Sequence, residues 1–139
     1  MSDCQRFRFV ILGCGNRGQY FASWIKDHPD AGSVVAVAEP NPAFRRRVAE
    51  QHGLSSDLCF ERWEDLLDRP RMGDVIVNTM MDRLHAPSAL RAFPLGYHML
   101  LEKPMATTPE ECAAIDRSAR EHGRIVSVCH SLRYHQVYH

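Results

Sequence analysis

Three glycines near the amino terminus have the spacing of a phosphate-binding turn. The segment Gly13-Cys14-Gly15-Asn16-Arg17-Gly18 is a G-x-G-x-x-G that directly follows a short apolar run. In such a turn the first glycine permits a tight bend, the second lets the main chain approach a pyrophosphate, and the third lets the next helix pack on the strand. The amino end of that helix offers free N–H groups and a positive dipole to phosphates. The residues predicted to bind a dinucleotide here are Gly13, Gly15, Asn16, Arg17 and Gly18; a glycine-rich turn without a ligand is the alternative.

An acid follows at the distance expected for ribose recognition. Glu39 ends the second apolar run, 21 residues after Gly18. A carboxylate there hydrogen-bonds the adenosine ribose hydroxyls and repels a 2′-phosphate, so Glu39 favours NAD over NADP. The arginines Arg45, Arg46 and Arg47 lie close by, and an arginine can hold a 2′-phosphate. A solvated helix face also explains them, so NAD is preferred and NADP stays open.

A lysine stands at the end of the fifth apolar run, in Glu102-Lys103-Pro104. Ligands of doubly wound sheets bind beyond the carboxyl ends of the strands. A lysine at such a place can hold a substrate hydroxyl, and burial can tune its pKa for proton transfer. Taken alone, a lysine at a strand end is more often a surface charge, so its catalytic role depends on the rest of the pattern.

The elements that must position these residues alternate between short apolar runs and helical stretches. Most runs are continuously apolar, which is typical of strands covered on both faces of a parallel sheet. We therefore predict an α/β fold, a doubly wound parallel sheet of Rossmann type with about six strands and helices on both faces. The expected strands are 8–12, 33–38, 57–60, 75–78, 98–101 and 125–128.

Helical spacing of apolar residues predicts the buried face of each helix. Thr108, Pro109 and Glu111 form a capping box, which opens a helix that runs to His122 and ends at Gly123. Pro94 is expected to end the preceding helix early, and 63–67 is predicted to be a short packing helix. The residues expected to face the core are Phe21, Trp24 and Ile25, then Phe44 and Val48, then Ala86, Ala89, Leu90 and Phe93, and finally Cys112, Ile115 and Ala119.

Composition narrows the classes of function. The chain has 139 residues, 45% of them hydrophobic, with 17 acidic and 17 basic side chains. A neutral chain of this size fits one domain and gives no electrostatic argument for nucleic acid or an anionic membrane. No apolar run approaches the roughly 18 residues that span a bilayer, and no signal-peptide cleavage pattern is present. Five scattered cysteines without a C-x-x-C favour a cytoplasmic protein, and neither Cys129-His130 nor the pair His135 and His139 predicts a metal site.

In order along the chain, the glycine motif, Glu39, Asp82-Arg83-Leu84-His85 and Glu102-Lys103-Pro104-Met105-Ala106 resemble the glucose–fructose oxidoreductase / inositol dehydrogenase / rhizopine-catabolism (Gfo/Idh/MocA) family. The resemblance covers essentially all 139 residues, and the E-K-P within a Rossmann unit is its most specific motif. It implies an NAD(P)-dependent oxidoreductase that acts on hydroxyl and carbonyl groups of sugars, polyols and cyclitols.

The resemblance also implies roles for individual residues. Lys103 would lie beside the nicotinamide, contact the reacting oxygen and act as the catalytic residue. Glu102 would lie near the nicotinamide ribose, and Asn78 and Thr79 would border the cofactor. His85, at the start of the next helix, would bind the cofactor; helix capping or packing is the alternative role.

Two further features follow from the same family pattern. The Lys103-Pro104 peptide is a candidate for the cis form, and Arg133-Tyr134 resembles a pair near the nicotinamide edge. Family sequences often carry a proline soon after that pair, whereas His135-Gln136 follows here.

The pattern divides the chain into a Rossmann domain, 1–130, and the start of a connection, 131–139, to a C-terminal substrate domain that is absent. The resemblance implies that this second domain covers the nicotinamide and supplies most substrate contacts. We therefore expect the chain to bind dinucleotide but to turn over slowly or not at all. The substrate's identity and homo-oligomer formation stay open.

Three other functions remain alternatives. The first is a non-catalytic dinucleotide-binding regulatory protein on the same scaffold. The second is an NAD-dependent glycosidase of the same family. The third is a different nucleotide binder, such as an S-adenosylmethionine enzyme, against which the E-K-P at the fifth strand argues.

Overall fold

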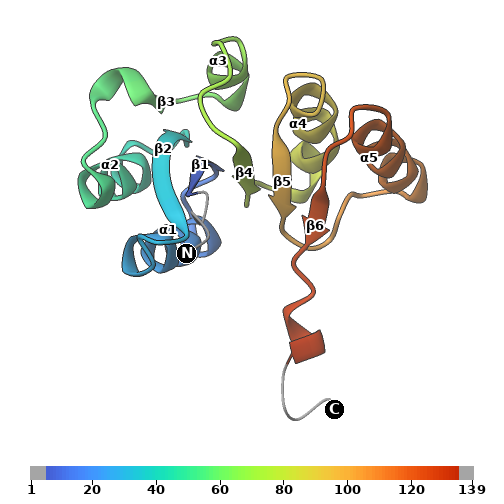
Figure 1. The fold of residues 1–139 in the computed structure, drawn as a ribbon, viewed down its shortest axis with the longest axis horizontal. Helices are drawn as coiled ribbons and strands as arrows, with labels where there is room; N and C mark the ends of the chain where they lie inside the picture. Colours follow the sequence, from blue (N-terminus) through green and yellow to red (C-terminus); the bar gives the residue numbers. More distant parts are fainter. Residues whose placement is uncertain (1–5, 135–139) are drawn as a thin grey trace, which may run out of the picture.

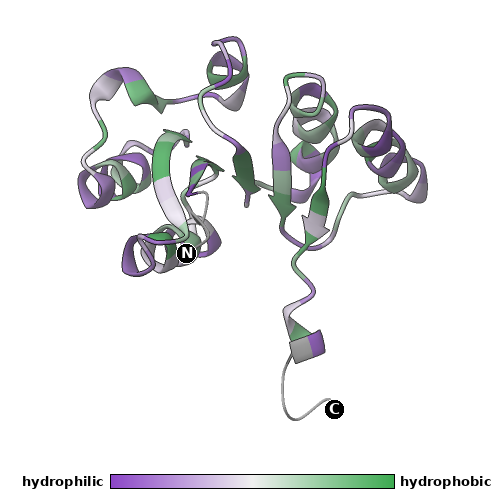
Figure 2. Cartoon of the chain, viewed as in Figure 1, coloured by the Kyte–Doolittle hydropathy of each residue, from purple (hydrophilic) through white to green (hydrophobic). Residues whose placement is uncertain are grey.

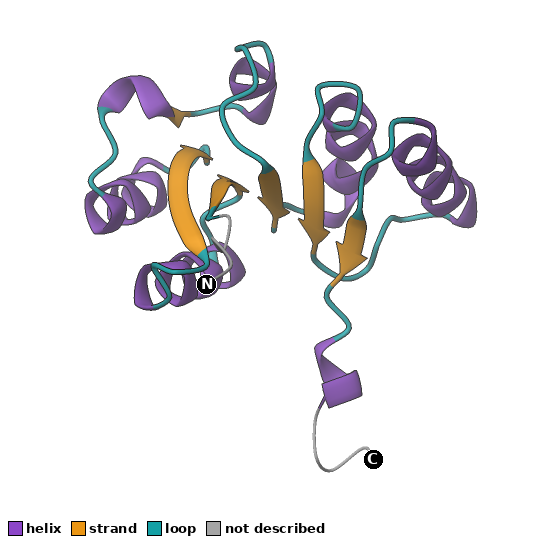
Figure 3. Ribbon diagram, viewed as in Figure 1, coloured by secondary structure: helices purple, strands orange, loops and turns teal. Residues whose placement is uncertain are grey.

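Six parallel strands form one sheet in the order β3-β2-β1-β4-β5-β6 in the computed structural model, which describes residues 6–134 (Figure 1; Figure 3). This order, with the reversal between β1 and β4, is that of the Rossmann fold, and the predicted doubly wound parallel sheet is confirmed. Short 3-10 turns occur at Ser56–Leu58, Asp82–Leu84 and Ser131–Tyr134. The main elements are β1 (Phe7–Leu12), α1 (Asn16–Asp27), β2 (Gly32–Ala38), α2 (Pro42–His52), β3 (Cys59–Phe60), α3 (Trp63–Leu67), β4 (Val75–Asn78), α4 (His85–Ala92), β5 (His98–Leu101), α5 (Pro109–Glu121) and β6 (Val126–Val128).

Strand register brings the ends of the central strands to one edge. Leu12, the last residue of β1, lies level with Ala38 of β2 and Asn78 of β4. Asn78 in turn lies level with Leu101 of β5. The loops that leave these four strands therefore begin side by side, although they are far apart in the sequence.

Alternation along each strand divides the core into two layers. On β1, Val10 and Leu12 face α3, α4 and α5, whereas Ile11 faces α1 and α2. Figure 1 shows α1 and α2 on one side of the sheet and α4 and α5 on the other. Figure 2 shows the strands between them as mostly hydrophobic ribbon. Burial on both faces explains why the runs are continuously apolar.

Four of the six strands begin at a different residue than predicted: β1 and β2 begin one residue earlier, and β3 and β6 begin later. The strand expected over 57–60 is only Cys59–Phe60, because the residues before it turn into a 3-10 helix in which Leu58 N–H donates to the Ser55 carbonyl (3.0 Å). At the other edge, β6 begins at Val126, and Ile125 is 68% exposed. β3 and β6 are the two edge strands, and pairing on one side only allows them to begin later.

Three aromatic or aliphatic residues expected in the core are exposed. Trp24 is 44% exposed and stacks on His28, with ring centroids 4.2 Å apart. Phe44 and Leu90 are also exposed. On α1 the buried stripe is instead Gly18, Ala22 and Ile25. Small residues at this face let the helix approach the sheet closely, which leaves the large ring at the periphery. Burial is confirmed for Ile25, Val48, Ala86, Ala89, Phe93, Ile115 and Ala119, and Cys112 is half-buried against the same core.

Helix ends follow the predicted chemistry with one change. The Thr108 hydroxyl accepts a hydrogen bond from Glu111 N–H (3.2 Å), but the Glu111 carboxylate bonds Thr107 rather than Thr108. The helix ends at Glu121, with Gly123 at φ +61°. α4 ends at Ala92, before Pro94, and α3 occupies 63–67 as expected. Within residues 6–134, the helices are too short or too polar to cross a membrane.

Candidate functional site

The glycine turn after β1 is packed so tightly that no larger residue fits at two of its glycine positions. Gly13 has φ +88°, and a Cβ there would lie 2.9 Å from the main chain of Thr79 and Met80. A Cβ on Gly18 would lie 2.0 Å from the Gly13 carbonyl oxygen. The turn and the first turn of α1 therefore pack directly on the loop that follows β4.

Gly15 differs, because a Cβ there would meet no atom within 4 Å. It is the N-cap of α1, and no side chain caps that helix end. Asn16 and Arg17 are exposed in the same turn. The amino end of α1 thus presents uncapped N–H groups to open space, the arrangement that binds phosphate.

Glu39 is held against this turn by two main-chain N–H groups. Its carboxylate accepts hydrogen bonds from Cys14 N–H (2.7 Å) and from Asn41 N–H (2.8 Å). Burial, and then the nearby Glu39 charge, raise the pKa of the Cys14 thiol to about 12, so this cysteine stays neutral. A fixed carboxylate at the end of β2 can accept hydrogen bonds from vicinal hydroxyls.

Two of the three neighbouring arginines have hydrogen-bond partners within the protein. Arg45 donates to the main-chain carbonyls of Glu39 and Pro40. Arg47 donates to the Gln19 side chain (2.9 Å). These two guanidinium groups are therefore already engaged, whereas the Glu39 carboxylate is bonded by main-chain N–H groups.

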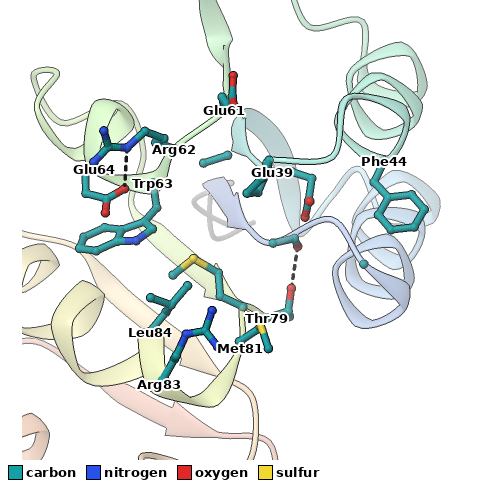
Figure 4. Close-up of a pocket in the computed structure, with 15 residues that line it drawn as sticks. Glu39, Phe44, Glu61, Arg62, Trp63, Glu64, Thr79, Met81, Arg83 and Leu84 are labelled. Carbon is teal, nitrogen blue, oxygen red and sulfur yellow. Dashed lines mark hydrogen bonds and ion pairs between the residues drawn. The ribbon is translucent and has the colours of Figure 1, made fainter.

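A cavity of about 530 Å³ opens beside Glu39, within the usual range for a small-molecule site. Its walls come from the loops after β1, β2, β3 and β4 (Figure 4). Arg62, Trp63 and Arg83 line it, and the sequence analysis did not assign them to the site. All three follow the carboxyl end of a strand, β3 or β4, and this position could have marked them as site residues. Trp63 was instead interpreted only as part of a packing helix. Phe44, expected in the core, also lines this cavity.

The two residues expected to border the cofactor after β4 have different positions. The Thr79 hydroxyl donates to the Gly13 carbonyl (2.7 Å), and Thr79 lines the cavity. Asn78 is fully buried, and its amide donates to the Ser88 hydroxyl (2.8 Å). Its side chain supports the loop from inside, and contact of Asn78 with the cofactor stays a prediction.

His85 also lies inside the protein. It is fully buried at the start of α4. Its ring lies between the carbonyl oxygens of Pro104 (2.8 Å from Nδ1) and Met80 (3.1 Å from Nε2). In this position the ring supports the two loops, as the packing alternative expects, and contact of His85 with the cofactor stays a prediction.

The E-K-P element lies beyond β5, with its acid buried and its lysine exposed. Glu102 accepts hydrogen bonds from Arg17 Nε (2.6 Å) and from Lys103 N–H (3.1 Å). The Lys103-Pro104 peptide is cis, as predicted. The Lys103 ammonium has no ion pair within residues 6–134, so it is available to a ligand.

Other expected features add nothing to the site. Across the part of the chain that the structure describes, no group of three His, Cys, Asp or Glu side chains could hold a metal. Arg133 is exposed in the last 3-10 turn, and the Tyr134 side chain is not described. His135, Gln136 and His139 lie outside the described residues.

Comparison with known proteins identifies the family of the chain. A family model described as "Oxidoreductase family, NAD-binding Rossmann fold" (GFO_IDH_MocA) matches residues 7–130. An inositol 2-dehydrogenase/D-chiro-inositol 3-dehydrogenase from Halalkalibacterium halodurans is 30% identical over 132 residues, which cover 94% of this chain and 37% of that protein. A scyllo-inositol 2-dehydrogenase (NADP(+)) from Bacillus subtilis is 35% identical over 124 residues, covering 89% and 33%.

Among solved structures, the WlbA dehydrogenase from Bordetella pertussis, in complex with NADH and UDP-GlcNAcA, is 25% identical. It superposes with a TM-score of 0.85, covering 96% of this chain and 40% of that one. The chain thus spans about a third of the length of the curated relatives it matches.

Proposed function

The chain belongs to the Gfo/Idh/MocA oxidoreductase family with an NAD-binding Rossmann fold, and from this premise we propose that it is the cofactor domain of a dehydrogenase for a sugar, polyol or cyclitol. The proposal rests on the observation that three groups lie at the carboxyl end of the same sheet. These groups are the open turn at Gly15, the fixed carboxylate of Glu39 and the exposed Lys103. Inositol dehydrogenases among the relatives support the substrate class.

The cofactor would cross the point where the strand order reverses. The pyrophosphate would bind at Gly15 and the amino end of α1. The adenosine would occupy the cavity beside Glu39 and Trp63, and the other half would extend toward Lys103. The cavity would hold only the adenosine half, so its lining comes from the loops after β1, β2, β3 and β4. The loop after β5, which carries Lys103, would face the nicotinamide half.

A bound nicotinamide would exchange a hydride with the substrate carbon. Lys103 would donate a hydrogen bond from Nζ to the reacting oxygen and help to move its proton. Glu102 would hold the Lys103 main chain in place through the 3.1 Å hydrogen bond. Asn78 and His85 would keep the flanking loops in position from inside the protein.

Binding of the two nicotinamide cofactors tests this proposal and its preference for NAD. We expect calorimetry to show that NAD+ binds more tightly than NADP+, because Glu39 would accept from the ribose hydroxyls and repel a 2′-phosphate. Glu39→Gln keeps an acceptor for Cys14 N–H but removes the charge. It should reduce the NAD+ preference about tenfold, equivalent to about 1.4 kcal/mol. An unchanged preference in Glu39→Gln would remove Glu39 as its cause, and no heat with either cofactor would defeat the proposal.

The second test concerns turnover. We expect the 139-residue chain to give no steady-state dehydrogenase rate with myo-inositol and NAD+, although it binds the cofactor. Hydride transfer needs a positioned substrate in a largely water-excluded site, whereas Lys103 is exposed here. Absorbance at the NADH band over hours, with a full-length inositol dehydrogenase as positive control, measures the rate. A clear rate from this chain would contradict the expectation.

A further inference from the structure

One ion pair crosses the proposed cofactor path. Arg17 lies in the first turn of α1 and Glu102 directly after β5, 85 residues later. Since β4 lies between β1 and β5 in the sheet, the Arg17 side chain reaches past the end of β4. Its Nε lies 2.6 Å from the Glu102 carboxylate. The pair therefore joins the glycine turn to the E-K-P element.

The two partners differ in exposure. The Glu102 side chain is 8% exposed, whereas that of Arg17 is 47% exposed. The Arg17 guanidinium lies 5.1 Å from the centre of the Tyr20 ring and 5.2 Å from that of Phe21. These rings support the guanidinium from its own helix by cation–π contact. Arg17 is thus oriented as a counterion for a buried carboxylate.

We propose that Arg17 is a positioning residue, which neutralises Glu102 and fixes the main chain of Lys103, rather than a ligand of the pyrophosphate. The inference rests on the proposed function for its effect on cofactor binding. The other Glu102 oxygen accepts from Lys103 N–H, so the carboxylate carries the constraint from Arg17 to the lysine. A neutral pair also spares an anionic dinucleotide the repulsion of a lone carboxylate.

Removing Arg17 alone would leave a buried negative charge, which is costly. Cofactor affinity would then fall, because the uncompensated carboxylate repels the anionic dinucleotide, and this loss would disappear when residue 102 is made neutral by substitution. Loss of a direct phosphate ligand would instead cost the same affinity whether or not residue 102 carries a charge.

The other groups that face Glu102 do not produce this signature. Lys103 lies beside it in the same loop and Cys129 at the end of β6. Burial, followed by the Glu102 charge, raises the pKa of the Cys129 thiol, which keeps it neutral. His85, from α4, contacts the Pro104 carbonyl, and His130 follows Cys129 and is exposed. All four are present in every variant compared below.

The test is NAD+ calorimetry at neutral pH on wild type, Arg17→Met, Glu102→Gln and the double variant. Arg17→Met should bind NAD+ about tenfold more weakly than wild type. In the Glu102→Gln background, loss of Arg17 should change affinity less than about threefold. An equal loss in both backgrounds would overturn the inference.

Urea unfolding without cofactor provides a second readout. Arg17→Met leaves the buried Glu102 carboxylate without its counterion, so its unfolding midpoint at neutral pH should fall further below wild type than the midpoint of the double variant falls below Glu102→Gln. Equal decreases in the two backgrounds would overturn the inference. If Arg17→Met does not fold, comparing Glu102→Gln with the double variant still decides between counterion and phosphate ligand. If wild type binds no nicotinamide cofactor, the proposed function fails, while the unfolding profiles still test the ion pair.

Discussion

At the scale of single residues, the glycine motif contains two kinds of glycine. Gly18 is required by the fold, because a Cβ would lie 2.0 Å from the Gly13 carbonyl oxygen. Gly15 is not required by the fold, because its surroundings are open and its φ of −67° is allowed for any residue. The absence of a side chain at Gly15 therefore matters only for a ligand that enters this open space. The same motif thus separates a packing requirement from a binding requirement.

The two glycines should respond differently to alanine. Gly18→Ala should destabilise the domain by about 3 kcal/mol, because the main chain must shift. Gly15→Ala should change the free energy of unfolding by less than about 1 kcal/mol but weaken NAD+ binding at least about tenfold, because the methyl group would meet the pyrophosphate. Urea unfolding and calorimetry on both variants measure the two effects. Wild-type NAD+ affinity in Gly15→Ala would refute the assignment of the pyrophosphate to this turn.

At the scale of elements, the position of the site at the carboxyl ends of the strands depends on contacts at their amino ends. Asp74, just before β4, accepts hydrogen bonds from Arg8 N–H (2.9 Å), the Arg8 guanidinium (3.0 Å) and the Arg71 guanidinium (2.9 Å). These bonds connect the start of β4 to the start of β1. The side-chain hydrogen bond from Arg8 is the largest cause that holds the pKa of Asp74 well below its usual range. The register of β1 and β4, on which the position of Thr79 against Gly13 depends, is thus anchored by an ion-pair cluster.

Asp74→Asn should lower stability at neutral pH and lose its effect in acid. The pKa of Asp74 is depressed in the folded state, so its contribution is complete above the unfolded pKa of about 3.9 and declines as pH falls below it. We expect a loss of about 1–2 kcal/mol near neutral pH, limited by the exposure of the arginines. Urea midpoints of wild type and variant, compared near neutral pH and near pH 2.5, measure the change. A gap between the two proteins that stays constant down to the lower pH would contradict this account.

At the scale of the whole molecule, the site lies across the reversal of strand order, and both halves of the sheet contribute to it. Gly15 and Glu39 come from the half containing β1 and β2, and Lys103 from the half containing β4 and β5. A ligand that spans these groups binds only when both halves are folded and aligned. Binding and folding are therefore linked for the entire domain.

This linkage predicts that NAD+ stabilises the whole domain. At a free concentration one hundred times its Kd, NAD+ should raise the free energy of unfolding by about 2.7 kcal/mol. Thermal unfolding followed by circular dichroism, over a series of NAD+ concentrations, measures the shift. Gly15→Ala is the matched control, because it should fold like wild type, and with at least tenfold weaker binding the same NAD+ concentration should stabilise it by no more than about 1.4 kcal/mol. A wild-type midpoint that does not move with NAD+ would contradict binding at this edge.

Much of the fold could be predicted because the relevant signals are local. The apolar runs, the capping residues before α5 and the glycine spacing each occupy a few consecutive residues, and the parallel sheet follows from their alternation. Errors arose at edges and surfaces. The stripe Gly18, Ala22 and Ile25 took the buried face of α1 that Trp24 was expected to share, because close packing of a helix on a sheet selects small residues. β3 was shortened because an edge strand pairs on one side only.

Residue types and their spacing were enough to predict the dinucleotide-binding features, namely the glycine turn, the acid Glu39 and the strand-end Lys103. Which side chains face the open end of the sheet depends on how the strands and helices pack. This packing turned Asn78 and His85 inward, brought Trp63 to the cavity and paired Arg17 with Glu102 across 85 residues. The physical reason is that glycine spacing and apolar periodicity are properties of neighbouring residues. Burial, counterions and cavity walls instead depend on which strand ends lie side by side.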